Sequence, residues 1–378
     1  MQFRGYHGEA VTDVRSLLTR ATIVAATASM ALIIAGGAAQ AASSPHWQVS
    51  YRSHSAVPDG LSSVTAPGKR DAWAVGVTSY RNGTTRPLVL HWNGSAWHKQ
   101  AMPASFRPAF AESSSPNDVW IFGQTGSIGQ EALVWDGSTW TAVPMPQISG
   151  GPFAVVSRSD VWADGEGSCT STGCTTTVWH WNGAAWTSAQ VPGVVQDIAG
   201  AGSAAWVFTL TYLRNIASGD PTGRPVIYRA TGDSLQRFTA PNRRVWDFAN
   251  LAASPGGQLW MRASPATNRN RTLLFHWNGR QWADAAVPGN ASGSPLILED
   301  PLIFDGHKGV WDGAYAHWTG TKWVNAFQIA SMPGTDAFGL SDIATIPGSS
   351  SIWGAGSVGR SASNHTHDSL IAVYGGTP

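Results

Sequence analysis

The feature that most constrains this chain is an internal repeat with a period of 40 to 50 residues. One unit begins with Asp71-Ala-Trp-Ala-Val-Gly76 and closes with His91-Trp-Asn-Gly-Ser-Ala-Trp97. The leading tryptophans of successive units are 42 to 54 residues apart: Trp73, Trp120, Trp162, Trp206, Trp260, Trp311 and Trp353. Each unit is too short to form a domain alone, so we expect seven similar units to bury their apolar faces against one another.

Each unit divides into four short apolar runs, which we name strands A to D. Strand B carries the leading tryptophan, and strand C ends just before an Asn-Gly or Asp-Gly pair such as Asn93-Gly94. These pairs accept the positive φ of a tight hairpin turn. Four antiparallel strands in each of seven units predict an all-β fold, a seven-bladed β-propeller.

The seventh unit lacks its last strand. It contains Trp353 and ends with the run Ile371–Gly376, without a second tryptophan. We expect the N-terminal segment Trp47–Tyr51 to complete this blade and close the ring, because an open ring would leave sheet edges unpaired. An alternative alignment is open, since His46–Pro58 matches His91–Pro103 in length, although without the Asn-Gly turn.

The N-terminus has the pattern of an export signal. Arg15 and Arg20 precede the apolar run Ala21–Ala35, and Ala39-Gln-Ala41 forms a small-residue cleavage site. The run is shorter than the roughly 20 residues of a membrane span. We therefore predict a signal peptide at residues 1–41, cleaved after Ala41, and a secreted propeller at residues 42–378. The alternative is an uncleaved anchor.

Composition excludes some partners. Only 12% of the residues are charged and the formal net charge is +1, whereas a polyanion-binding protein has a basic excess. The 20 tryptophans argue against disorder. We expect a folded monomer that binds no nucleic acid and, once the signal peptide is removed, no membrane.

The repeat resembles those of the kelch and galactose-oxidase-like superfamily. The shared features are a strand B that ends in glycine, a strand C that ends in an aromatic residue followed by Asn or Asp, and a tryptophan that opens strand D. The chain departs from kelch repeats because Trp73-Ala-Val-Gly76 lacks the usual Gly-Gly pair, and it is more similar to tryptophan-rich secreted bacterial propellers. The resemblance implies the fold more than a function.

The resemblance also implies that B–C and D–A loops share one face of the ring. The B–C loops differ in length while the C–D turns hardly vary, and loop diversity on a rigid scaffold favours binding. The alternative is drift in unselected surface loops. Polar and aromatic side chains in these loops predict a ligand-binding surface for a glycan or an extracellular protein: Arg81, Asn82, Glu166, Tyr212, Arg214, Asn268, Arg269, Arg271, Arg360 and Asn364.

Two clusters are candidates for chemistry. Asp164 and Glu166 form a carboxylate pair suited to acid–base catalysis or cation binding, although strand B could instead end before Asp164. His365, His367 and Asp368 are the candidate metal ligands, but the sequence identifies no third strong ligand beyond the two histidines and an aspartate. Cys169 and Cys174, close together in an exported chain, predict a disulfide.

The repeated aromatic residues favour structural roles. The tryptophans and the histidines that precede strand C tryptophans recur at fixed positions, so we expect them to pack the blades. The histidines concerned are His91, His180, His276 and His317. No complete catalytic motif or cofactor motif occurs. The sequence therefore favours a secreted, non-enzymatic binding module without a cofactor; the alternatives are a carbohydrate-active hydrolase or lyase and a structural cell-surface protein.

Overall fold

The computed structural model consists of antiparallel β-sheets joined by turns. It describes residues 45–126, 129–212, 222–246, 250–266, 272–285, 301–314, 316–326, 338–359 and 367–376, and all structural statements concern these residues. They belong to one compact unit, Ser44–Pro378. In this part of the chain there are seven sheets, one for each sequence repeat.

The sheets follow the chain in order, and strands A to D run through each sheet from one edge to the other. Blade 1 contains β2 (Asp59–Gly68), β3 (Asp71–Ser79), β4 (Thr85–Trp92) and β5 (Trp97–Lys99). Blade 2 contains β6 (Phe106–Ser115), β7 (Asp118–Thr125), β8 (Gly129–Trp135) and β9 (Trp140–Pro144). Blade 3 contains β10 (Ile148–Ser157), β11 (Asp160–Thr170), β12 (Gly173–Trp181) and β13 (Trp186–Pro192).

The remaining blades repeat the pattern, with one addition in blade 4. Blade 4 contains β14 (Val194–Ala201), β15 (Ala204–Tyr212), β16 (Thr222–Thr231), β17 (Ser234–Phe238) and the extra strand β18 (Val245–Trp246), which pairs with β16. Blade 5 contains β19 (Asn250–Ala253), β20 (Leu259–Ala263), β21 (Leu273–Trp277) and β22 (Trp282–Ala285). Blade 6 contains β23 (Leu302–Phe304), β24 (Val310–Asp312), β25 (Ala316–Trp318) and β26 (Trp323–Asn325). Blade 7 contains β27 (Phe338–Thr345), β28 (Ile352–Gly359), β29 (His367–Tyr374) and β1 (Trp47–Arg52).

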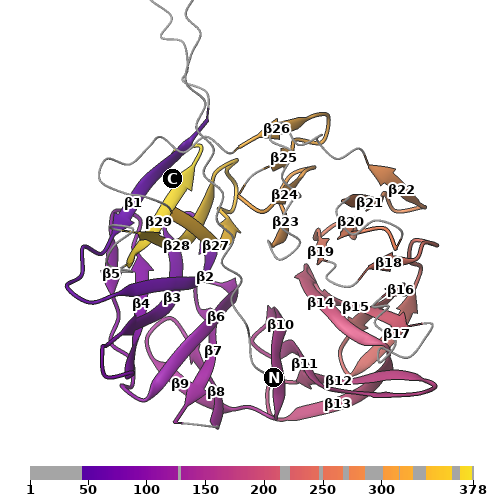
Figure 1. Cartoon of the computed structure of the whole chain (residues 1–378), viewed down its shortest axis with the longest axis horizontal. Helices are drawn as coiled ribbons and strands as arrows, with labels where there is room; N and C mark the ends of the chain where they lie inside the picture. Colours follow the sequence, from indigo (N-terminus) through magenta and orange to yellow (C-terminus); the bar gives the residue numbers. More distant parts are fainter. Residues whose placement is uncertain are drawn as a thin grey trace, which may run out of the picture. The chain divides into compact units, whose positions relative to one another are not determined.

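The blades form a ring through their innermost strands. Each A strand contacts the A strands of both neighbouring blades, in the cycle β2, β6, β10, β14, β19, β23, β27 and back to β2. Figure 1 shows the blades following one another from indigo to yellow. The prediction of an all-β, seven-bladed propeller is confirmed.

The N-terminal strand completes the last blade, as expected. β1 pairs antiparallel with β29, and the two lie side by side in Figure 1. Trp47 is opposite Tyr374, as Trp97 is opposite Trp92 in blade 1. Trp47 is therefore the missing strand D tryptophan of the seventh repeat. This register decides between the two alignments, because the alternative placed Trp47 at the end of a strand C.

The tryptophans pack each blade against the next. The leading tryptophans are buried, with Trp73 and Trp353 wholly inaccessible. Trp73 of blade 1 lies 5.6 Å from Trp135 and 5.1 Å from Trp140 of blade 2 between ring centroids, the second contact edge-to-face. Aromatic pairs in this geometry contribute about 0.5–1.5 kcal/mol beyond the area that they bury. The predicted packing role of these tryptophans is confirmed.

One blade contains an aspartate that joins the leading tryptophan to the strand C histidine. In blade 3, His180 stacks on Trp162 at 4.3 Å, and Asp160 Oδ1 accepts a hydrogen bond from Trp162 Nε1 at 2.6 Å. His180 Nε2 bonds the same oxygen at 3.1 Å. Burial alone would lower the pKa of His180, but Asp160 and Asp233 together raise it. This Asp–Trp–His arrangement gives the buried polar atoms partners, as nearly all such atoms have in folded proteins.

Side chains of the A strands also form hydrogen bonds with neighbouring blades. Asp342 of blade 7 accepts hydrogen bonds from Ser63 Oγ at 2.7 Å and from the Val64 N–H of blade 1 at 3.0 Å. Asp197 of blade 4 accepts from the Leu251 N–H of blade 5 at 2.7 Å. Each of these carboxylates therefore holds the backbone of the next blade at the centre of the ring.

The predicted disulfide is present. Cys169 and Cys174 are bonded at the tip of the hairpin between β11 and β12. In the described residues, no helix is long and apolar enough to cross a membrane.

Candidate functional site: a cavity between blades 5 and 6

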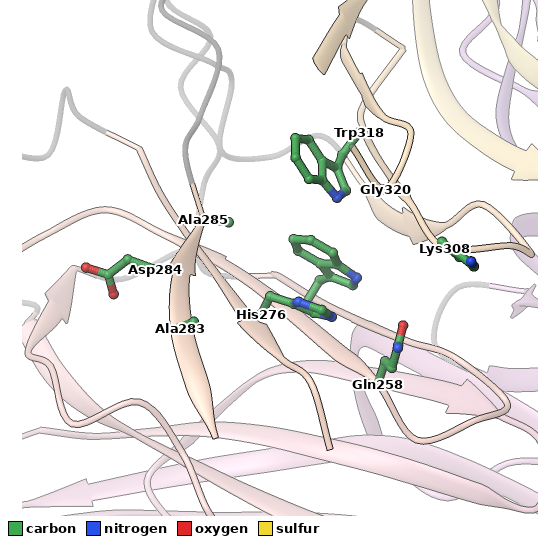
Figure 2. A pocket seen from close by; sticks show the side chains of 9 residues that line it. Gln258, His276, Ala283, Asp284, Ala285, Lys308, Trp318 and Gly320 are labelled. Carbon is green, nitrogen blue, oxygen red and sulfur yellow. The ribbon is translucent and has the colours of Figure 1, made fainter. Parts of the chain in front are cut away.

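A cavity of about 520 Å³ lies where blade 5 meets blade 6 (Figure 2). It is at the end of the blades that carries the A–B and C–D turns. Its walls come from both blades: Gln258, Trp260, His276, Ala283, Asp284 and Ala285 from blade 5, and Lys308, Trp318 and Gly320 from blade 6. The volume is in the range typical of small-ligand sites.

The cavity lies beside an aromatic contact that is slightly longer than those at three other junctions. Trp318 lies 6.5 Å from Trp260 between ring centroids. The corresponding distance is 5.3 Å between blades 7 and 1, 5.6 Å between blades 1 and 2, and 6.2 Å between blades 2 and 3. The stack inside blade 5 is unchanged, since His276 lies 4.0 Å from Trp260 with an interplanar angle of 14°. Aromatic faces of the repeat therefore become walls of a cavity.

Two buried nitrogen atoms at this junction have no hydrogen-bond partner among the described residues. Gln258 stands two residues before the leading tryptophan, where other blades have Asp71, Asp118 or Asp160. Within the described residues, neither Trp260 Nε1 nor His276 Nε2 makes a hydrogen bond. Burial lowers the pKa of His276 and favours the neutral imidazole. An unmatched buried polar group costs about 1–3 kcal/mol, so both atoms favour a partner.

Of the two charged residues that line the cavity, one has an ion-pair partner among the described residues and the other has none. Asp284 faces Arg243, with 3.2 Å between Oδ2 and a guanidinium nitrogen. Lys308 forms no ion pair with any described residue. Gly320 has φ +90°, and a Cβ at this position would lie 3.0 Å from Cβ of Lys308, so glycine lets the C–D turn lie against this lysine. The cavity wall thus carries a positive charge that no described residue neutralises through an ion pair.

The carboxylate pair predicted in blade 3 lies elsewhere. Asp164 is inside β11, which continues to Thr170, so the expectation that the strand ends before Asp164 is wrong. The buried carboxylate fits because Gly151 on the neighbouring strand has no side chain; a Cβ there would be 2.7 Å from both oxygens. Glu166 is exposed and accepts a hydrogen bond from Gln147 Nε2 at 2.7 Å. A register shift follows Asp164 and gives the two carboxylates different surroundings.

The predicted B–C loop residues are only partly described. Arg81 and Asn82 are exposed, and Asn82 Oδ1 accepts hydrogen bonds within its own turn from the Thr84 N–H and Oγ1. Tyr212 is half-buried against the core of blades 4 and 5. The other predicted ligand-binding residues lie outside the described residues: Arg214, Asn268, Arg269, Arg271, Arg360 and Asn364. This surface therefore stays a prediction.

The candidate metal ligands occupy two environments. Asp368 is buried and forms an ion pair with Arg52 at 2.9 Å. The preceding residue, His367, is exposed at the start of β29. His365 lies outside the described residues. No cluster of three or more potential metal ligands occurs in the described part of the chain.

Sequence reasoning missed the cavity because it assigned every repeated aromatic residue to the core. Three of the four repeated histidines do bond an aspartate: His91 with Asp71, His180 with Asp160 and His317 with Asp305. His276 is the exception. The available signal was Gln258, the position at which blade 5 departs from the Asp-x-Trp pattern of blades 1 to 3.

Comparisons with known proteins agree with the fold. No protein-family model and no curated protein matches the sequence. Among solved structures, the chain is similar to YCF48 bound to D1 peptide, with a TM-score of 0.51, 13% identity and coverage of 87% of this chain and 94% of that chain. It is also similar to the β-propeller domain of the Trilobed protease from Pyrococcus furiosus, with a TM-score of 0.53, 10% identity and coverage of 84% and 96%.

A third similar structure is an acylaminoacyl peptidase, with a TM-score of 0.54 and 9% identity. The match covers 84% of this chain but 51% of the peptidase. At these identities the likeness shows the fold alone. The chain is thus a seven-bladed β-propeller with tryptophan-rich clusters between its blades.

Proposed function

We propose that this protein is a secreted, non-enzymatic binding module and that the cavity between blades 5 and 6 holds a sugar ring of a glycan. The observation that carries this proposal is the cavity itself, which is lined by Trp260, His276 and Trp318 and lies beside two polar atoms that have no partner among the described residues. Small-ligand sites combine apolar or aromatic walls with a few placed polar groups. A pyranose matches this combination, because it has an apolar C–H face and a rim of hydroxyl groups.

A binding role is favoured over hydrolysis by the carboxylates present. Glycosidases use two carboxyl groups that flank the scissile bond. Among the described residues that line the cavity, Asp284 is the one carboxylate, and it faces Arg243. Asp164 and Glu166, the predicted catalytic candidates, are not among the lining residues.

Secretion is supported by two features of the chain. The export pattern at residues 1–41, which lies outside the described residues, directs the protein out of the cell in our proposal. The Cys169–Cys174 disulfide fits an extracellular protein, since disulfides persist in oxidising compartments. In this proposal the B–C loops provide a separate contact surface at the opposite end of the blades, and the kelch-like resemblance of the repeats concerns their fold.

The test is binding of the purified protein to a glycan array and a polysaccharide panel, with mass spectrometry of the same samples. We expect binding without product, and Trp318→Ala should weaken it by about tenfold or more, because a hot-spot aromatic contributes over 1.4 kcal/mol. Trp181→Ala, the matching strand C tryptophan of blade 3, should leave affinity unchanged. Product formation would contradict a non-enzymatic role, and binding of a protein but no glycan would contradict the ligand class.

A further inference from the structure

We propose that the ligand of the blade 5–6 cavity is an acidic glycan, and that the carboxylate of a uronic acid residue takes the place of the aspartate that blade 5 lacks. This inference rests on the proposed function and specifies its ligand. The repeat itself supports this inference, because blades 1 to 3 show which chemical group pairs with the leading tryptophan or the strand C histidine.

Blade 3 provides the template. The single oxygen Asp160 Oδ1 meets both Trp162 Nε1, at 2.6 Å, and His180 Nε2, at 3.1 Å. Blades 1 and 2 each use half of this arrangement. Asp71 bonds His91 at 3.1 Å, and Asp118 accepts from Trp120 Nε1 at 3.0 Å. In blades 1 to 3 a carboxylate is therefore the partner of the leading tryptophan, of the strand C histidine or of both, while Trp73 Nε1 in blade 1 bonds no described residue.

Blade 5 keeps the two nitrogen groups and loses the carboxylate. Trp260 is opposite His276 in the strand pairing, as Trp162 is opposite His180. The two stacks also agree, with centroid distances of 4.0 Å and 4.3 Å and interplanar angles of 14° and 19°. Gln258 stands at the aspartate position, and Trp260 Nε1 and His276 Nε2 are buried without a partner among the described residues, so a ligand carboxylate must displace the side chains that cover these two atoms. An indole N–H can only donate, so the partner must be an acceptor.

The charge at the cavity favours an anionic acceptor over a neutral one. Lys308 lines the wall without an ion pair to any described residue, while the one lining carboxylate, Asp284, is already matched by Arg243. Hydrogen bonds to a carboxylate are roughly twice as strong as those between neutral groups. In Figure 2, Lys308 and Gln258 lie to the right of the His276 ring, and Trp318 lies above it. A ligand with a carboxylate at one end and an apolar ring face at the other matches this arrangement.

The test compares methyl β-D-glucuronide with methyl β-D-glucoside, which differ in the carboxylate alone. Both are titrated into the full-length protein by calorimetry and by ¹H–¹⁵N spectra in which the Trp260 indole N–H is resolved. We expect the glucuronide to bind about tenfold more tightly, as a charge-assisted hydrogen bond should give, and to shift the indole resonance.

Gln258→Asp is the decisive variant, because it places the blade 3 carboxylate in blade 5. The variant should fold, since Asp160 occupies the matching position in blade 3. Its glucuronide affinity should fall about tenfold, because the new carboxylate occupies the position of the ligand carboxylate and repels its charge. Gln258→Asn, neutral and of the same size as aspartate, should keep the preference for glucuronide. Lys308→Gln should reduce that preference.

The outcomes separate this inference from the proposed function. Equal binding of glucoside and glucuronide would overturn the acidic ligand and leave the glycan-binding function standing. Absence of binding by every glycan tested would overturn both. Unchanged glucuronide affinity in Gln258→Asp would overturn the inference that the ligand carboxylate takes the position of the aspartate that blade 5 lacks. A glutamate-containing peptide that shifts the Trp260 indole while glucuronide does not would show that the carboxylate comes from a protein, which also overturns the inference.

Discussion

A single aspartate has a large structural role in this fold because it serves two buried donors at once. In blade 3, Asp160 bonds both an indole and an imidazole, whereas Asp71 in blade 1 bonds the imidazole alone. Loss of one partner leaves the other buried group unsatisfied. The number of donors that an aspartate serves should therefore determine how much stability its removal costs.

We expect Asp160→Ala to lower the free energy of unfolding by about 2–4 kcal/mol, because two buried polar atoms lose their acceptor. Asp71→Ala is the matched control and should cost about half as much, since one partner is affected. Urea unfolding followed by tryptophan fluorescence measures both. Equal losses in the two variants would contradict the shared-acceptor account.

The opposite change should stabilise blade 5. Gln258→Asp supplies an acceptor to Trp260 Nε1 and His276 Nε2, so we expect a gain of about 1 kcal/mol in the absence of ligand. Gln258→Asn should gain less, because its amide oxygen is a weaker acceptor than a carboxylate. Thermal unfolding by differential scanning calorimetry gives the comparison. A loss of stability in Gln258→Asp would show that the aspartate site of blade 3 is not reproduced in blade 5.

At the scale of elements, the strand β1 matters most because it joins the two ends of the described chain. Trp47 is 2% exposed, lies 5.6 Å from Tyr374 between ring centroids and donates a hydrogen bond to the Ala314 carbonyl of blade 6 at 3.2 Å. Val49 on the same strand is 44% exposed. One strand thus offers a buried residue and an exposed residue for comparison.

Trp47→Ala should destabilise the propeller by about 3–5 kcal/mol, the usual range for a buried aromatic residue replaced by alanine. Val49→Ala should change stability by less than about 0.5 kcal/mol. Chemical unfolding of both variants tests this. If the two variants were equally stable, β1 would not contribute to ring closure through Trp47.

The elements could be predicted from the sequence because the determinants are local and repeated. Asn-Gly turns such as Asn93-Gly94 and the spacing of leading tryptophans indicate strand order, and the lack of a final strand in the seventh repeat pointed to Trp47. The end of β11 was misplaced, because the fit of Asp164 depends on Gly151 from a neighbouring strand. The cavity could not be found in this way, since the aromatic contact beside it, at 6.5 Å, differs little from the contacts of 5.3 to 6.2 Å at other junctions, and residue types do not encode such a difference.

At the scale of the whole molecule, the ring gathers carboxylates on its innermost strands. Burial raises the pKa of Asp197 and of Asp342 to about 6, against the hydrogen bonds that each accepts. The Glu112 side chain is in contact with solvent, and yet desolvation by the surrounding protein, with the charges of Asp342 and Asp197, raises its pKa to about 8. These groups come from blades 2, 4 and 7, so their interaction is a property of the closed ring.

The effect of the hydrogen bonds that Asp342 accepts from blade 1 can be measured separately from the effect of its charge. Asp342→Asn keeps an acceptor for the Val64 N–H and removes the buried charge, so stability at pH 8 should be unchanged or higher. Asp342→Ala leaves that N–H unsatisfied and should cost about 1–3 kcal/mol. Unfolding in urea at pH 8 compares them. Equal losses from both substitutions would mean that the carboxylate charge, and not the hydrogen bond, holds blades 7 and 1 together.

The raised carboxylate pKa values make stability depend on pH in a defined direction. The folded protein holds a proton on Glu112 up to about pH 8, whereas the unfolded chain releases it near the ordinary value of 4.5. Between these values the folded state binds more protons, so stability falls as pH rises. Asp197 and Asp342 act in the same direction between 3.8 and about 6. His276, whose pKa is lowered by burial, acts in the opposite direction near its ordinary pKa of 6.5.

Glu112→Gln isolates the contribution of one group. Because glutamine cannot release a proton, the variant should match the original protein near pH 4.5 and become more stable as pH rises to 8. There we expect a melting temperature higher by roughly 1–2 °C, about the effect of 1 kcal/mol in a propeller of this size, after allowance for solvent contact. Scanning calorimetry of both proteins across this range measures the difference. A difference independent of pH would show that Glu112 does not titrate within the ring, and the carboxylates would then act as separate residues rather than as one coupled centre.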